Sequence, residues 1–175
     1  PGGGFIGTYG IMKVRSGDIY SLKTDNVYNI DKAAKDLPTI TPPEAMRKLL
    51  KVQTWFFRDS NWSPDFPTSA QQALYLFQRQ GGQKNLDGVV AITPTAIAHM
   101  IGLVGPIKVS GIEFTKENFV SQLQYQGEQG FLKAGIPEGQ RKDIISTMTS
   151  QLMNKILNLP ISEWKDLFLT VNDQL

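Results

Sequence analysis

Residues 55–67 combine charged, amide and aromatic side chains in a segment with no sustained helical or strand period. Arg58 and Asn61 can donate hydrogen bonds, and Asp59 and Asp65 offer the carboxylate oxygens that Mg²⁺ prefers. Long segments without regular structure often carry function. We therefore expect these residues to bind an oxyanion, a hydrated metal ion or both.

Two tryptophans flank this polar group and point to a different kind of ligand. The rings of Trp55 and Trp62 could stack on a sugar or pack against an acyl chain. A purely structural interpretation stays open, in which the aromatics anchor the loop, Asp65 caps the following helix and Arg58 pairs with Asp59. The residue types alone do not separate these interpretations.

A second polar cluster lies where a predicted strand ends, between Lys23 and Asp31. Asp25 and Asp31 there are candidate metal ligands or bases, because ligands gather at strand ends in open α/β sheets. The alternative is that both are ordinary turn residues. Arg141 and Lys142 form a third cluster at the start of the longest predicted helix, where cations beside free backbone amides favour a bound anion over plain surface charge.

Composition excludes several other kinds of chemistry. The 175 residues contain no cysteine, so thiolate nucleophiles, disulfides and Cys-ligated metals are absent. His99 is the only histidine and lies in an apolar run, which is typical of a packed helix residue rather than a member of a triad. The net charge of +2 is too small to indicate a nucleic-acid partner. No apolar stretch approaches the length of a membrane span.

Hydrophobic periodicity predicts the elements that must position these clusters. The chain length fits one domain over residues 1–175. Because it opens on Pro1 and glycines and ends inside a plausible helix, we expect a fragment trimmed at both ends. Paired strands followed by strand and helix alternation predict the α/β class, with a mixed sheet in a three-layer α/β/α arrangement. The predicted strands are residues 5–14, 19–28 and 88–92, and residues 106–114 are predicted as another hairpin or an edge strand. The predicted helices include 43–51, 68–80, 93–101, one that starts at Thr115, and 138–157.

Several segments together resemble the bacterial domain-of-unknown-function family 4012. The resemblance spans nearly the whole chain and rests on residues 1–10, 24–28, 58–69, 87–95 and 105–107, of which the third is the most specific. Members of that family typically lie outside the cytoplasmic membrane behind an N-terminal transmembrane helix. The resemblance therefore implies an extracytoplasmic, membrane-anchored protein of the cell envelope, with its anchor in a segment outside this chain.

More distantly, the order of elements is similar to LytR-CpsA-Psr proteins. These transfer glycopolymers from a polyprenyl-pyrophosphate carrier, using arginines, acidic residues and a magnesium ion. Arg141 and Lys142 resemble the helix start that holds pyrophosphate in that family. At the hairpin the pattern departs, because Thr24-Asp25 stands where that family has an arginine–aspartate pair, and glycines replace its arginine–serine–aspartate motif.

The resemblance implies a Mg²⁺-dependent phosphotransferase that acts on a polyprenyl-pyrophosphate-linked glycan or another anionic envelope ligand. The alternative is a non-catalytic envelope module that binds a glycan or a lipid through the same cleft. The expected catalytic residues are Asp25, Arg58, Asp59 and Arg141. The expected substrate-binding residues are Trp55, Asn61, Trp62 and Lys142. The expected metal ligands are Asp25, Asp59 and Asp65.

Overall fold

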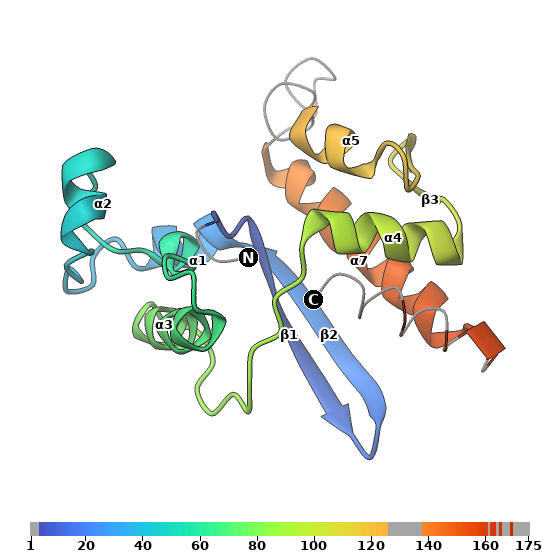
Figure 1. Ribbon diagram of the computed structural model, residues 1–175, viewed down its shortest axis with the longest axis horizontal. Coiled ribbons are helices and arrows are strands. Elements are labelled where there is room, and N and C mark those ends of the chain that lie inside the picture. The colour runs from blue at the N-terminus through green and yellow to red at the C-terminus, as the bar shows by residue number, and fades with distance from the viewer. Residues whose placement is uncertain (1–3, 126–137, 161, 164, 166–168, 170–175) are drawn as a thin grey trace. The chain divides into compact units, whose positions relative to one another are not determined.

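The chain forms helices and two small antiparallel sheets, which places it in a mixed class of α and β structure (Figure 1). This computed structural model describes residues 4–125, 138–160, 162, 163, 165 and 169, with residues 138–143, 145 and 146 described in backbone only. It divides into two compact units, residues 1–90 and 91–175. A single domain over the whole chain stays a prediction.

The first unit opens on the predicted β-hairpin. Strand β1 (Thr8–Arg15) pairs antiparallel with β2 (Asp18–Asn26), and Ser16 and Gly17 both adopt positive φ in the tight turn between them. The second strand is shorter than predicted, because the Asn26 side chain accepts a hydrogen bond from the Tyr28 amide. That bond caps a helix the periodicity did not predict, α1 (Val27–Ala33).

Three more elements complete this unit: α2 (Glu44–Leu49), the 3₁₀ turn η1 (Phe57–Asp59) and α3 (Phe66–Arg79). Asp65 caps α3 through a 2.9 Å bond from the Thr68 amide, and Gly81 with φ of 94° follows its end. These observations confirm the predicted helix and its predicted cap. The buried core of the unit consists of Val27, Ile30, Phe57, Ala73, Leu76 and Phe77.

The strand predicted over residues 88–92 is wrong. The structure has no strand there, and Val90 and Ile92 are 76% and 54% exposed. A short apolar run does not reveal by itself whether it is buried, and this run lies in the chain between two separate cores. In the described part of the chain each sheet has two strands, so a three-layer arrangement is not confirmed.

The second unit contains α4 (Pro94–Val104), β3 (Ile107–Val109), β4 (Ile112–Phe114), α5 (Phe119–Tyr125) and α7 (Glu138–Leu157). Its predicted helices and hairpin are confirmed. The apolar stripe of α7 is buried at Ile144, Met148, Leu152 and Ile156. Among the described residues, no helix has the length and apolar character needed to span a membrane.

Candidate functional site

An arginine and two aspartates come together in the first unit, between α1 and η1. The Arg58 Nη1 atom lies 2.9 Å from Asp31 Oδ2, and its Nε atom lies 3.5 Å from Asp59 Oδ2. The Asp31 side chain is only 3% exposed, whereas those of Arg58 and Asp59 are 24% and 20% exposed. We call these three residues the acid–arginine cluster.

Hydrogen bonds to the backbone of the loop that carries Arg58 hold this arginine in place. The buried Gln80 side chain, at the end of α3, accepts from the Phe57 amide at 3.1 Å and donates to the Trp55 carbonyl at 3.2 Å. On the other side of η1, the Ile6 amide donates to the Arg58 carbonyl at 2.9 Å. The loop is therefore fastened to α3 and to the segment before β1, which fixes where Arg58 projects.

The cluster holds two carboxylates against one guanidinium. Burial raises the pKa of Asp31 and of Asp59, and the neighbouring Arg58 opposes that rise in both. Asp31 Oδ1, Asp59 Oδ2 and Ser60 Oγ are buried without a hydrogen-bond partner within the described part of the protein. The two carboxylates already engage the guanidinium, so the cluster does not favour a bound anion.

Two aromatic rings lie beside the Arg58 guanidinium, and one of them is exposed at the surface. The Arg58 Cζ atom lies 4.7 Å from the Phe56 ring centroid and 5.7 Å from that of Tyr28. The Tyr28 ring in turn contacts Phe5 at 5.8 Å between centroids. Phe5 and Tyr28 are 55% and 54% exposed, so a pair of open rings adjoins the acid–arginine cluster.

Asn61 lies near this pair of rings through the backbone of Gly4. A Cβ placed on Gly4 would come within 3.5 Å of the Asn61 amide nitrogen, so the segment that carries Phe5 passes close to Asn61. Trp62 follows directly and is 40% exposed. We call Phe5, Tyr28 and Asn61 the aromatic surface, and Trp62 is joined to it by chain neighbourhood alone.

Asp25 is bonded in a different corner, where β2 meets α1. Its carboxylate accepts from the Tyr9 hydroxyl at 3.4 Å, from the Asn26 amide at 2.7 Å and from the Asn29 side-chain amide. Burial, and then the negative charge and hydrogen bond of Asp25, raise the pKa of Tyr9. Asp25 therefore fixes the start of α1, and no contact joins it to Arg58 among the bonds of the described residues.

The predicted metal set of Asp25, Asp59 and Asp65 does not form one site. Asp65 is an exposed helix cap, and its pKa is lowered by the hydrogen bonds from the Thr68 hydroxyl and amide. No group of three or more aspartate, glutamate or histidine side chains in the described ranges could hold a metal ion. Asp25 and Asp65 have structural partners of their own, and the metal role of this set stays a prediction.

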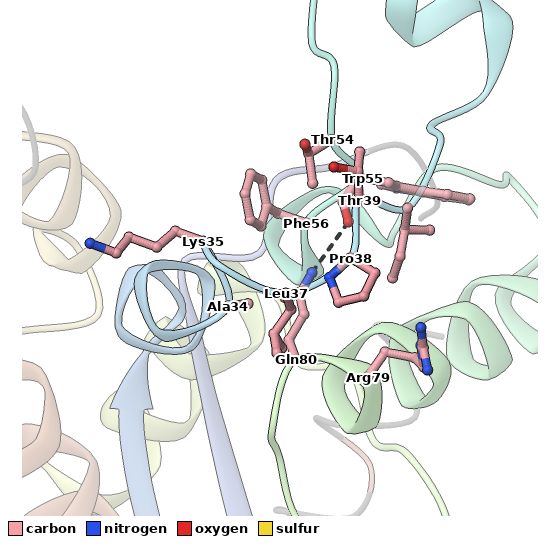
Figure 2. Close-up of a pocket in the computed structure, with 11 residues that line it drawn as sticks. Ala34, Lys35, Leu37, Pro38, Thr39, Thr54, Trp55, Phe56, Arg79 and Gln80 are labelled. Carbon is pink, nitrogen blue, oxygen red and sulfur yellow. Dashed lines mark hydrogen bonds between the residues drawn. The ribbon is translucent and has the colours of Figure 1, made fainter.

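Trp55 contributes to the frame of the site more than to its surface. Its indole nitrogen donates to the Asp59 carbonyl at 3.1 Å. Trp55 also lines a shallow pocket with Phe56 and Gln80. Figure 2 shows the hydrogen bond from the Gln80 side chain to the Trp55 carbonyl. The pocket encloses about 30 Å³, which is room for about two water molecules and too little for a sugar ring.

Arg141 and Lys142 belong to α7, in the second unit. Their side chains lie outside the described residues, so the structure places neither of them at the acid–arginine cluster. Sequence reasoning left Phe5 and Tyr28 out of the expected site, and it named Asp31 as a candidate ligand or base without Arg58 as its partner. Recognition of Asn26 as a helix cap was the signal that could have found Tyr28, because a helix from Val27 sets Tyr28 and Asp31 one turn apart.

Fold and site together define a protein of mixed α and β class whose N-terminal unit sets a buried acid–arginine cluster beside exposed aromatic rings. The family model described as "Protein of unknown function (DUF4012)" matches residues 1–127, well over half of the chain. The chain therefore belongs to that family, as its motifs indicate. No curated protein and no solved structure matches it significantly.

Proposed function

We propose that the N-terminal unit is a non-catalytic binding module that recognises a glycan through the aromatic surface. The observation that carries this proposal is the state of Arg58, which is already paired with Asp31 and Asp59 while the rings beside it are open. An arginine engaged by two carboxylates has little positive charge left for a phosphate. Exposed rings next to polar groups remain available.

Sugar chemistry matches this combination of groups. The apolar faces of sugar rings pack on aromatic side chains, and their hydroxyls need donors and acceptors nearby. Phe5 and Tyr28 supply the faces, Asn61 supplies an amide with both functions, and Asp59 supplies a partly exposed carboxylate. Such a surface binds neutral glycans without chemical change to them.

The proposed setting is the bacterial cell envelope. Family membership supports it, because the resemblance implies an extracytoplasmic protein anchored by a segment outside this chain. A glycan-binding module there would meet peptidoglycan or another envelope polysaccharide as its partner. Cell fractionation of the full-length protein, with protease added to intact spheroplasts, tests this location.

Binding of peptidoglycan-derived oligosaccharides, first on a glycan array and then by calorimetric titration, tests the proposed function. Tyr28→Ala removes one open ring, and we expect binding to weaken on the order of tenfold, as for other central aromatic contacts. Tyr20→Ala is the matched control, because Tyr20 is also exposed and also lies beside an arginine, Arg15, but belongs to strand β2 and not to the aromatic surface. Equal losses in both variants, or no binding by the unaltered chain, contradict the proposal.

A second candidate is Mg²⁺-dependent phosphotransfer from a polyprenyl-pyrophosphate-linked glycan, within the three-layer fold of the LytR-CpsA-Psr proteins. One observation favours it: Asp31 and Asp59 have raised pKa values beside an arginine, which suits a general base that accepts a proton from an attacking hydroxyl. The resemblance alone assigns Arg141 and Lys142, in the second unit, to pyrophosphate binding. Turnover of a polyprenyl-pyrophosphate glycan that needs Mg²⁺ and is lost in Asp59→Asn supports this candidate, whereas glycan binding that persists in chelator without turnover supports the module.

A further inference from the structure

The Arg58 guanidinium lies over the ring of Tyr28, a member of the aromatic surface. The distance from Arg58 Cζ to the Tyr28 ring centroid is 5.7 Å. Among the described residues, the other ring in contact with Tyr28 is that of Phe5, at 5.8 Å between centroids. Because Tyr28 is 54% exposed, the guanidinium is one of the few groups that can restrict the orientation of its ring.

Asp31 holds that guanidinium from the same helix. Tyr28 and Asp31 are three residues apart in α1, so their side chains share a face of the helix. Asp31 Oδ2 accepts a hydrogen bond from Arg58 Nη1 at 2.9 Å, and the Asp31 side chain is 3% exposed. A charged hydrogen bond fixes a guanidinium more firmly than an exposed ion pair does. Arg58 therefore spans one turn of α1, anchored at Asp31 and lying over Tyr28.

The other neighbours of the guanidinium cannot replace this anchor. Asp59 Oδ2 lies 3.5 Å from Arg58 Nε, which is longer than an ordinary hydrogen bond. The Phe56 ring centroid lies 4.7 Å from Arg58 Cζ, but the ring has no charge. In the part of the chain that the structure describes, Asp31 is thus the acceptor of the one side-chain hydrogen bond that Arg58 donates.

We propose that the Asp31–Arg58 pair regulates glycan binding at the aromatic surface, with Arg58 as a positioning residue that keeps the Tyr28 ring in its binding orientation while Asp31 is charged. This inference rests on the proposed function, in which the Tyr28 ring packs on a sugar. Loss of the charge on Asp31 frees the guanidinium to leave the ring. The glycan must then order Tyr28 as it binds, and that ordering lowers the affinity.

The proposal predicts glycan binding that weakens in acid. Burial raises the pKa of Asp31, and two charged groups of η1 act on it: Arg58 lowers the pKa and Asp59 raises it. On β2, Asp25 is bonded to partners of its own. As the pH falls through the raised pKa, Asp31 takes up a proton and loses its charge, so the Kd should rise. Calorimetric titration between pH 4 and 8 with a short oligomer of N-acetylglucosamine, a sugar without titratable groups, measures this dependence.

Two variants separate the positioning role from plain stability. Asp31→Asn keeps an acceptor beside Arg58 and should raise the Kd about twofold to fivefold at neutral pH, the equivalent of about 0.5–1 kcal/mol for a cation–π contact at an exposed site. Asp31→Leu with Arg58→Met replaces the pair by apolar side chains, which is often neutral for stability, and should weaken binding by a similar factor. Lys35→Gln with Asp36→Asn is the matched control, because it removes an exposed ion pair just beyond α1 and should leave the Kd unchanged.

A double-variant cycle shows whether Asp31 acts through the ring. In a chain that already carries Tyr28→Ala, Asp31→Asn should have no further effect on the Kd. Additive losses would overturn the proposal, because Asp31 would then affect binding by a route other than Tyr28. An unchanged Kd in Asp31→Asn would overturn it as well.

The ring can also be followed without any glycan, by NMR of the chain with labelled tyrosines. Tyr28→Phe identifies the Tyr28 signals, which should move in Asp31→Asn and should follow the titration of Asp31, whereas those of Tyr75 on α3 should not. Unmoved Tyr28 signals contradict the inference even where the glycan binds. Moved signals in a chain that binds no glycan support the positioning of the ring and contradict the proposed function alone.

Discussion

Asp31 shows how one buried side chain changes the role that its neighbour, Arg58, can have. An exposed Arg58 would be a natural phosphate ligand, as its position among polar and aromatic residues indicates. Asp31 is almost fully buried and holds the guanidinium at 2.9 Å, so the arginine is an internal counter-ion. Breaking such a pair is costly, because the remaining charge stays buried without compensation.

The raised pKa of Asp31 predicts a pH dependence of stability. The folded state holds the proton of Asp31 more tightly than the unfolded state, whose carboxyl has the ordinary value of 3.8. Protons bound by the folded state stabilise it, so the free energy of unfolding should fall as the pH rises from about this value through the raised pKa. Above the raised pKa the contribution of Asp31 becomes constant.

In Asp31→Asn this part of the pH dependence should disappear. Urea denaturation between pH 4 and 8 measures the difference in unfolding free energy between the variant and the unaltered chain. Asp36→Asn, whose side chain is 86% exposed, is the control for loss of a carboxylate as such. A difference between Asp31→Asn and the unaltered chain that does not vary with pH contradicts the assigned pKa direction.

At the scale of elements, the C-terminal end of α3 supports the acid–arginine cluster. The Gly82 amide donates to the Phe77 carbonyl at 2.8 Å, so the chain turns back across the last turn of the helix. Phe77 is buried and contacts the Tyr9 and Phe57 rings at 5.2 and 5.3 Å between centroids. Phe57 is the first residue of η1, so its packing against Phe77 fixes the turn that contains Arg58.

A side chain at Gly82 should disturb this support. A Cβ there would lie 2.5 Å from the Phe77 ring, so Gly82→Ala must displace a packed aromatic side chain. We expect a loss of about 1–3 kcal/mol in unfolding free energy. In Gly88→Ala the added Cβ meets nothing within 4 Å, so that variant should keep its stability or gain a few tenths of a kcal/mol. Thermal and urea unfolding of the pair provide the measurement, and equal stability of both variants would contradict this packing.

At the scale of the whole molecule, the buried apolar residues of the described ranges form two hydrophobic clusters. Leu76, fully buried, belongs to the first core, and Ile101, 1% exposed, belongs to the second. No buried residue is common to the two clusters in the described ranges. Each unit therefore has its own hydrophobic stabilisation.

Ile101→Ala should destabilise the second unit by about 2–5 kcal/mol, as large-to-small core changes do. Hydrogen exchange measured by peptide should show faster exchange in α4 and α7 and unchanged protection in α1 and α3. Leu76→Ala should give the reverse pattern. Uniform loss of protection across both units in either variant would instead support the single cooperative domain predicted for residues 1–175.

Local patterns in the sequence were sufficient for most elements and for the residues that cap them. Periodicity predicted the two strands of the first hairpin and α7 with the bounds observed, and the structural interpretation of residues 55–67 named Asp65 as the cap of α3. These features depend on neighbours within a few residues, so the sequence contains all the information that determines them. The family also followed from short motifs, and the family model confirms it.

Only the tertiary structure decided which polar groups meet. Arg58 and Asp31 are 27 positions apart, and their contact depends on a short helix whose sole local signal is its Asn26 cap. The tertiary structure also decided which residues are buried. The apolar run around Val90 is exposed, whereas the charged Asp31 is enclosed. Composition and periodicity describe what each residue prefers, but the partner of a charge and the cover of an apolar face are set by segments that are distant in the chain.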